Sequence, residues 1–402
     1  MAATNPAVSP TGLYAHVAGW GMAVPDRVLS NDDLSAIVDT NDEWIVSRTG
    51  IRERRIASER ESTATLGLKA AQRALDVADV LPVEIDLIIC ATSTSENVFP
   101  STASVIQGSL GATQAGAFDL SAACSGFVYA LNMAAQSIRT GSIRTAVVIG
   151  AETMSRVVNW QDRGTCILFG DGAGAVVLKA STEPGGILSA VLRSDGTGSD
   201  LLGLPTFGSI DADGIDLINN GHKLGKMFMN GGEVFKFATR VISESLPQAA
   251  QAAGVTMNDV TLIVPHQANA RILQSAARAM KVDETRFMSN LDRYGNTSAA
   301  SIPIALCEAV SQGKVKDGDY LAFVGFGGGL SWAAMVLKWG TPAPAPGSTS
   351  RFNWQRRRLS YASASGRTWF GRGLRRMRRA MARLTPGGSM KRLQREIDED
   401  LP

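Results

Sequence analysis

The chain has 402 residues, of which 45% are hydrophobic and 19% are charged, and this composition excludes a protein that is disordered throughout. Its net charge of +3 hides two parts of opposite sign: residues 341–402 carry 14 basic and 4 acidic side chains, whereas residues 1–340 carry 26 and 33. The sequence has no run of 18 apolar residues and no basic-then-apolar start, so it predicts neither a membrane span nor a secretion signal, and we expect a cytoplasmic protein.

The four cysteines, Cys90, Cys124, Cys166 and Cys307, are far apart and form no C-x-x-C pair. This spacing argues against the disulfide framework of a small secreted domain and against a structural zinc site. We therefore expect no metal, and at least one cysteine is a candidate for a working thiol.

From the N-terminus, short apolar runs alternate with longer amphipathic stretches. The runs Asp86–Cys90, Ala146–Gly150 and Ala173–Leu178 are typical of strands that are buried on both faces. This order predicts an α/β protein whose largely parallel sheet is covered by helices on both sides.

A repeat with an offset of 175 residues relates the two halves of the chain. Residues 87–90 (LIIC) correspond to 262–265 (LIVP), and residues 146–150 (AVVIG) correspond to 321–325 (LAFVG). Matches that recur in one order predict two similar α/β halves, which we place at 13–182 and 183–340. The Pro/Ala-rich residues 341–350 are typical of a linker, and it leads to an Arg-rich tail at 351–402.

Cys124 lies in the segment SAACSGF (residues 121–127), between an apolar run and an amphipathic stretch. This order predicts a strand-to-helix turn with the thiol at the helix N-terminus, where the helix dipole favours the thiolate and hence a nucleophile. The alternative is a small buried hydrophobic residue, so the surroundings of Cys124 have to decide.

Two polar residues of the second half are candidate partners of this thiol. His266, in VPHQAN (264–269), follows a predicted strand, and functional side chains of open α/β sheets gather beyond the carboxyl ends of strands. Asn296, in YGNTSAA (294–300), begins the helix that corresponds to the Cys124 helix, where it is equivalent to Ser121. An N-cap is the simpler interpretation of Asn296, but the repeat predicts that both helix starts face one cleft.

A thiol protease would also combine Cys, His and Asn, and the separation of Cys124 from His266 falls in the papain-like range. The sequence around Cys124 does not fit a papain-like protease, because no C-G-[SA]-C-[WY] pattern occurs and the cysteine lies far from the N-terminus. We therefore reject this interpretation.

The segment VDTNDEWIVSRTGIRER (residues 38–54), together with the Cys, His and Asn motifs, closely resembles the β-ketoacyl-acyl carrier protein synthase III family of the thiolase superfamily. The resemblance runs from about Val17 to Trp339. It implies a duplicated five-layer αβαβα fold and a homodimer, in agreement with the repeat. The tail lies outside it.

The resemblance also implies roles for the matching residues. Cys124 would take an acyl group from acyl-CoA as a thioester, and a malonyl group on acyl carrier protein would then lose CO2 and attack it. His266 and Asn296 would donate hydrogen bonds to the enolate oxygen. The backbone N–H groups of Cys124 and Gly328 would hold the oxyanion of acyl transfer, and Phe326 would favour decarboxylation by excluding water. The resemblance implies no cofactor.

Other matches concern the substrates. Trp44 and Arg163 match residues that stack on the CoA adenine, and Thr40 and Arg48 match contacts to the nucleotide. Phe99 matches an interface residue that closes the acyl pocket of the dimer partner.

Carrier-protein docking would use the basic side chains Lys236, Arg271 and Arg278. Two departures from the family pattern, Ala279 in place of a second basic residue and Gly232 in place of Asn, leave the choice of carrier open.

The tail allows several interpretations. Leu374, Met377, Met381 and Leu384 recur at near-helical spacing among arginines, which is typical of an amphipathic helix on an anionic membrane surface. Nucleic-acid binding, docking of acidic carrier proteins and a solvated extension without a ligand are the alternatives. We favour the solvated extension first, then the membrane, and we do not expect a nucleic-acid partner.

The sequence thus predicts a condensing enzyme that starts fatty acid synthesis from a short acyl-CoA and malonyl-acyl carrier protein. The alternative of the same class is a starter-unit condensing enzyme or acyltransferase of a specialised, polyketide-like pathway. An alternative of another class is a scaffold whose main task is the contact made by its tail.

Overall fold

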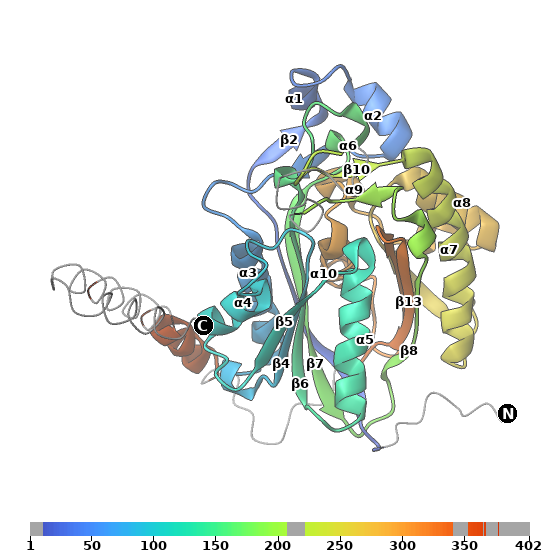
Figure 1. The fold of residues 1–402 in the computed structure, drawn as a ribbon. Coiled ribbons are helices and arrows are strands. Elements are labelled where there is room, and N and C mark those ends of the chain that lie inside the picture. Colours follow the sequence, from blue (N-terminus) through green and yellow to red (C-terminus); the bar gives the residue numbers. More distant parts are fainter. Residues whose placement is uncertain (1–10, 207–221, 341–352, 365, 367–376, 378–402) are drawn as a thin grey trace, which may run out of the picture.

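The computed structural model describes residues 11–206, 222–340 and 353–364, together with Gly366 and Met377. Two β-sheets and the helices packed on them form its body (Figure 1). Strands form where the sequence has uninterrupted apolar runs, and β6 (Thr145–Thr153) is buried along its whole length.

The first sheet has the strand order β1-β7-β6-β4-β5. In it, β4 (Leu87–Ala91) runs parallel to β5 (Gly116–Leu120) and to β6, whereas β7 (Asp171–Ser181) pairs antiparallel with β6 and with β1 (Tyr14–Ala23). The second sheet has the order β11-β12-β13-β8, with β11 (Val260–Pro265) parallel to β12 (Tyr320–Gly327). In the same sheet, β13 (Ser331–Lys338) pairs antiparallel with β12 and with β8 (Gly186–Ser194).

Helices fill the space between the sheets and cover their outer faces. α5 (Gly126–Arg139) and α10 (Ser301–Ser311) contribute apolar side chains to the cluster between the sheets. α3 (Thr63–Ala78) and α4 (Thr102–Leu110) cover the first sheet, and α7 (Gly231–Ala252) and α8 (Ala270–Met280) cover the second (Figure 1). The predicted five-layer α/β fold is therefore confirmed.

The 175-residue repeat is visible in the backbone. α5 begins at Gly126 and α10 at Ser301, and each follows a 3₁₀ turn, Ala123–Ser125 or Ser298–Ala300. Ala123 and Ser298 occupy the same place in these turns, and both have a positive φ, 46° and 49°. Because L-residues rarely adopt this conformation, both turns are held by the packing around them.

Short elements lie beyond the carboxyl ends of the parallel strands, at the top of Figure 1. They are β2 (Val28–Ser30), α1 (Asn31–Ser35), α2 (Asp42–Thr49), β3 (Glu53–Arg55), α6 (Arg163–Cys166), β9 (Leu202–Gly203), β10 (Phe228–Met229) and α9 (Leu291–Tyr294). Arg54 fixes this layer, since its fully buried guanidinium donates to Leu29 O and Ile167 O and to the side chain of Asn31.

Part of the tail packs on the body. Residues 353–364 are helical and lie near α3, in red in Figure 1. Arg357, only 3% exposed, pairs with Asp76 at 2.9 Å and with Asp79 at 2.7 Å, and Tyr361 packs against the apolar cluster beneath α3. This segment of the tail therefore packs on the body, although the tail lies outside the family resemblance.

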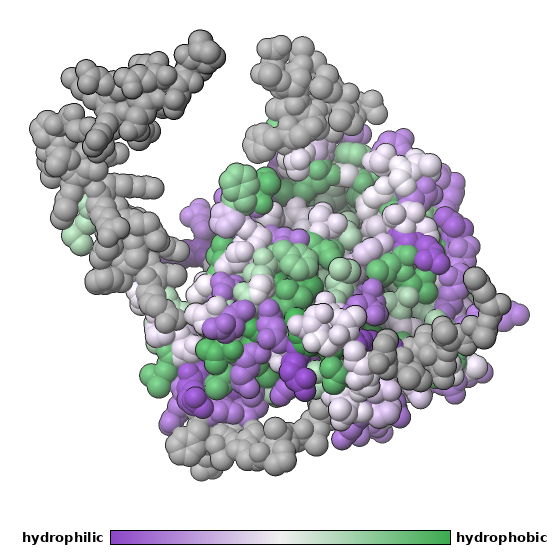
Figure 2. All heavy atoms as spheres, turned by 60° about the horizontal axis from the view of Figure 1, so that its bottom comes forward, coloured by the Kyte–Doolittle hydropathy of each residue, from purple (hydrophilic) through white to green (hydrophobic). Residues whose placement is uncertain are grey.

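The predicted linker at 341–350 lies outside the described residues, and so do Leu374, Met381 and Leu384 of the predicted amphipathic stripe. No helix of the described residues is long and apolar enough to cross a membrane. Figure 2 shows one face of the body, on which hydrophobic and hydrophilic side chains are interspersed.

Candidate active site

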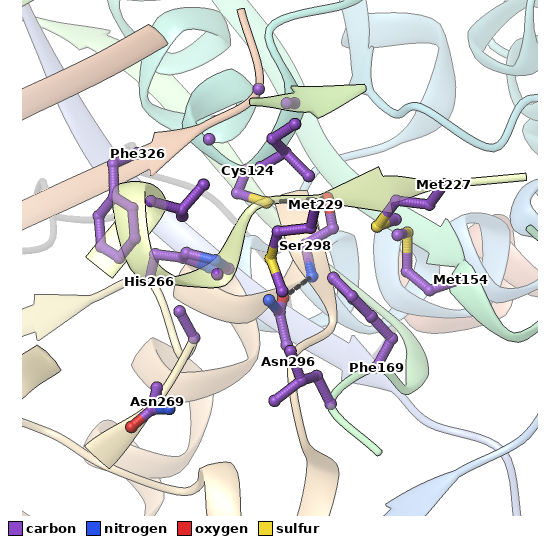
Figure 3. Close-up of a pocket in the computed structure, with 18 of the residues that line it drawn as sticks. Cys124, Met154, Phe169, Met227, Met229, His266, Asn269, Asn296, Ser298 and Phe326 are labelled. Carbon is purple, nitrogen blue, oxygen red and sulfur yellow. Dashed lines mark hydrogen bonds between the residues drawn. The ribbon is translucent and has the colours of Figure 1, made fainter. Parts of the chain in front are cut away.

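A cavity of about 650 Å³ opens at the carboxyl ends of the strands, between the two halves of the chain. Side chains of Cys124, His266, Asn296, Ser298 and Phe326 line it, and Figure 3 shows them around one space. The repeat-based expectation that both helix starts face one cleft is met, because Ser121 lines the same cavity as Asn296.

Cys124 is held where β5 gives way to α5. The close approach of the second half fixes this turn: a Cβ on Gly327 would lie 2.7 Å from the Cys124 nitrogen, and one on Gly325 would lie 2.9 Å from Ser125 Cα. A side chain at either position would clash with the start of α5, so the close contact between the end of β12 and this helix requires glycine.

The thiol is protonated at rest, contrary to the expectation of a ready thiolate. Cys124 is only 7% exposed, and burial raises its pKa to about 12. Its hydrogen bond to Ser298 acts in the opposite direction, while the nearby Glu152 carboxylate raises the pKa further. The start of α5 assists the thiolate as it forms, but the loss of hydration outweighs that help in the resting state.

His266 follows β11, and its backbone N–H donates to Val324 O at 2.8 Å. The hydroxyl of Thr297 donates to Ser301 Oγ, which lies 3.1 Å from His266 Nδ1 and can donate its own proton to that nitrogen. With Ser301 Oγ as the donor to Nδ1, the ring proton lies on Nε2. Burial lowers the His266 pKa to about 3, so the ring is neutral and can act as an uncharged donor.

Asn296 is fixed by a local hydrogen bond and does not cap the long helix. Its Oδ1 accepts from Ser298 N at 2.8 Å, the dashed line in Figure 3, whereas α10 begins only at Ser301. With Oδ1 occupied, the amide can offer its Nδ2–H groups to the cavity.

Phe326 and Gly328 come from the end of β12 and the turn after it. The Phe326 ring meets the His266 ring edge to face, with centroids 5.1 Å apart, and packs on that side of the imidazole (Figure 3). A Cβ on Gly328 would lie 3.0 Å from Leu202 O, so this position has little room for a larger residue.

The expected nucleotide contacts gather at the cavity mouth. Trp44 and Arg48 line the cavity, and the guanidinium carbons of Arg48 and Arg163 each lie 4.6 Å from the Trp44 ring centroid. Because Arg163 already stacks on the indole, an adenine can enter between them only if Arg163 moves. Thr40 does not line the cavity, but its Oγ1 is buried without a partner.

One side of the cavity is apolar and is lined by methionine and phenylalanine. Figure 3 shows Met154, Met227 and Phe169 on the side of the cavity away from Phe326. Phe99 is not part of this lining in the single chain, and it is 85% exposed.

The basic side chains that the sequence suggests for carrier docking lie on α7 and α8. Lys236, Arg271 and Arg278 are all exposed, and Arg271 also lines the cavity. Lys236 is paired with Glu233 at 2.8 Å, and this carboxylate offsets much of the positive charge of the lysine. The positive charge of the three basic side chains together is therefore smaller than the sequence suggests.

Sequence reasoning missed Ser298 and Glu152, which lie behind Cys124, and Thr297 and Ser301, which orient His266. Ser298 could have been found from the repeat, because it corresponds to the residue before the cysteine. Glu152 gives no such signal, since it occurs inside a strand. Among the described residues, no group of three His, Cys, Asp or Glu side chains is arranged to hold a metal ion.

A duplicated α/β fold with a buried cysteine facing a neutral histidine and an asparagine defines a thiolase-like condensing acyltransferase. Two family profiles match the chain, "3-Oxoacyl-[acyl-carrier-protein (ACP)] synthase III" over residues 118–196 and its C-terminal counterpart over residues 250–339. β-Ketoacyl-[acyl-carrier-protein] synthase III of Symbiobacterium thermophilum is 52% identical over 333 residues, which cover 83% of this chain and 99% of the relative. The chain therefore belongs to the β-ketoacyl-acyl carrier protein synthase III family, and it is a condensing acyltransferase of fatty acid biosynthesis.

Solved structures agree with this assignment. The structure of 3-oxoacyl-[acyl-carrier-protein] synthase III from Aquifex aeolicus is 45% identical with a TM-score of 0.74, and the match covers 81% of this chain and all of that one. The priming β-ketosynthase of the R1128 polyketide pathway is 38% identical with a TM-score of 0.75, covering 82% of this chain and 97% of that one.

Proposed function

We propose that the protein condenses a short, acetyl-CoA-like primer with malonyl-acyl carrier protein and so initiates fatty acid synthesis in the cytoplasm. The observation that carries this proposal is the meeting of Cys124, His266 and Asn296 in one cavity between the two halves. The reaction needs two substrates and no resident cofactor.

In the first half-reaction the Cys124 sulfur attacks the thioester carbonyl of acyl-CoA, the C–S bond to CoA breaks, and Cys124 retains the acyl group while CoA leaves as the thiol. Negative charge develops on the carbonyl oxygen, and the backbone N–H groups of Cys124 and Gly328 are the proposed donors for it. The start of α5 adds a favourable dipole at the same place.

In the second half-reaction malonyl-acyl carrier protein loses CO2, and the enolate carbon attacks the acyl-Cys124 carbonyl, which releases the thiolate again. His266 Nε2–H and Asn296 Nδ2–H donate to the enolate oxygen. A neutral histidine suits this task, because it retains its proton while charge forms on the substrate. Phe326 keeps water from this side of the ring.

Substrate contacts complete the proposal. Trp44, Arg48 and Arg163 bind the CoA nucleotide by stacking and charge, and the Thr40 hydroxyl, which is buried without a hydrogen-bond partner among the described residues, would join them once it becomes accessible. The exposed cations Lys236, Arg271 and Arg278 attract the acidic carrier protein to the cavity mouth.

A homodimer would account for the exposed hydrophobic side chains near the edge strand β5. Val98, Phe99 and Phe118 are 87%, 85% and 41% exposed, and β5 is the last strand of its sheet in the part of the chain that the structure describes. Such an edge and such side chains are typical of an interface. In the dimer, Phe99 would reach the partner's acyl pocket and limit the length of the primer.

The likeness to the R1128 priming ketosynthase favours a second candidate, the starter-unit condensing enzyme or acyltransferase of a specialised pathway. Both candidates use the same three side chains, so they differ in the acyl group and in the acceptor.

Incubation with radiolabelled acetyl-CoA and with longer and branched acyl-CoAs, followed by malonyl-acyl carrier protein, separates the two candidates. We expect acetyl to label the protein and a β-ketoacyl product to be released with CO2. Labelling by longer or unusual acyl groups alone, or transfer without CO2 release, would favour the specialised pathway. If no acyl group labels the protein, the proposed reaction is wrong.

The Arg-rich tail is proposed as a contact to anionic membrane surfaces. In its described part, the inner side of helix 353–364 is anchored through Arg357, and the exposed residues include Trp354, Arg358 and Leu359. The full chain should therefore co-sediment with phosphatidylserine-containing liposomes, whereas a chain ending at Gly340 should stay in the supernatant. If both chains stay in the supernatant, the tail has no such role.

A further inference from the structure

Behind the nucleophile, three side chains form a buried hydrogen-bonded chain. Cys124 Sγ lies 3.4 Å from Ser298 Oγ, and Ser298 Oγ donates to Glu152 Oε1 at 3.0 Å. Their exposed fractions are 7%, 2% and 0%, so water has little access to any of them. These hydrogen bonds connect the two halves of the molecule, since Glu152 lies on β6 and Ser298 lies in the turn before α10.

Glu152 is a buried carboxylate that no described cation neutralises. Its oxygens accept from the hydroxyls of Thr94 and Thr92, from the backbone N–H of Ser93 and, besides Ser298, from the backbone N–H of Ala299. On β7 the residue paired with Glu152 is Gly172, which has no charge. Glu152 in turn raises the pKa of the nearby thiols of Cys124 and Cys90.

His266 is less well placed to take the thiol proton. Its Nδ1 is engaged with Ser301, and a proton on Nε2 leaves the ring without a free lone pair toward the cavity. Burial lowers the pKa of His266 to about 3 and raises that of Glu152 to about 6, so the carboxylate is the stronger base.

We propose that Ser298 relays the proton of Cys124 to Glu152 during acyl transfer from acyl-CoA, which makes Ser298 a further catalytic residue and Glu152 a positioning residue that acts through it. This inference rests on the proposed function of Cys124 as the acyl acceptor.

In this step the S–H bond of Cys124 breaks as the sulfur bonds to the acyl carbon. The proton moves to Ser298 Oγ, and the hydroxyl proton of Ser298 moves to Glu152 Oε1. When the C–S bond to CoA breaks, the departing CoA sulfur takes the proton back and Glu152 is ionised again. During this acyl-transfer step the buried pair carries one negative charge, first on Glu152 and then on the reacting sulfur, so the step does not place two anions side by side.

Two substitutions test the relay. Ser298→Ala should keep the fold, because alanine occupies the equivalent position 123 at a φ of 46°. It also keeps the bond to Asn296 Oδ1, which is donated by the backbone nitrogen of residue 298. Glu152→Gln has nearly the same shape but is a weaker base. We expect single-turnover labelling of Cys124 to slow on the order of 10²-fold in both variants.

The pH profile of labelling separates a relay from a structural role. A base with a pKa of about 6 must be ionised to accept a proton, so wild-type labelling should rise with pH through about 6 and then level off. Glu152→Gln should lose this rise. Condensation by pre-acylated Ser298→Ala should proceed within a few-fold of the wild-type rate, since His266 and Asn296 are intact.

Matched controls remove buried polar groups elsewhere. Ser189→Ala removes a buried hydroxyl that donates to Ala249 O, and Asp171→Asn alters a buried carboxylate on β7. Both should lose some thermal stability but retain the wild-type rate and pH profile of labelling. The relay is overturned if the wild type is labelled and Ser298→Ala is labelled as fast, or if Glu152→Gln retains the rise near pH 6. Absence of labelling in the wild type would instead overturn the proposed function itself.

Discussion

Cys124→Ala should abolish labelling by acyl-CoA and reduce condensation by roughly 10⁴- to 10⁶-fold, as expected for the loss of a covalent nucleophile. The variant should still fold, because it removes one sulfur atom from a site that is already a cavity. The measurement is acid-stable radioactivity on the protein after incubation with acetyl-CoA, together with β-ketoacyl product release and a thermal melt.

Cys307→Ala is the matched control for this substitution. Cys307 is also 7% exposed, and burial raises its pKa to about 12 as well, but it lies inside α10 and does not line the cavity. It should be labelled like the wild type. Equal labelling of the wild type and Cys124→Ala would show that another group accepts the acyl chain.

The comparison of these two thiols shows what makes Cys124 a nucleophile. Their pKa values are raised alike, so a low resting pKa does not distinguish them. Only Cys124 combines access to the cavity, a helix start and a hydroxyl that leads to a carboxylate. Selectivity therefore comes from the surroundings that stabilise the thiolate while it attacks.

The fold and the positions of Cys124, His266 and Asn296 could be predicted because they follow local rules. Apolar runs mark the buried strands, and the 175-residue offset places the helix starts at Gly126 and Ser301 in equivalent positions. Functional side chains at the carboxyl ends of strands must then meet where the two halves face each other.

The features that could not be predicted from the sequence depend on contacts between residues that are distant in the chain. Glu152 and Ser298 have 145 residues between them, and the sequence around Glu152 gives no indication of their hydrogen bond. Likewise, Arg357 is one arginine among many in the tail, and only its pairing with Asp76 and Asp79 sets it apart. The pKa of Cys124 depends on such distant contacts too, because the helix start is a local feature whereas the burial that raises the pKa is not.

His266→Ala should separate the two half-reactions. Labelling of Cys124 should stay within about tenfold of the wild type, while condensation should fall about 10²- to 10³-fold, the usual cost of losing one donor to a developing oxyanion. His266→Gln retains an N–H donor and should recover part of the rate. His16→Gln, which changes a buried histidine bonded to Gly340 O and Glu183 O, serves as the control and should condense normally.

The pH dependence of condensation provides an independent check on His266. An exposed histidine would gain a proton near pH 6.5, but burial lowers the His266 pKa to about 3, so the ring stays neutral well below neutral pH. Condensation by pre-acylated protein should therefore show no loss of rate near pH 6.5. A loss there that disappears in His266→Gln would mean that His266 titrates in the acyl-enzyme, and its role as a neutral donor would be wrong. Because the Glu152 relay acts only in acyl transfer, the same pH series on the two half-reactions tests the two groups separately.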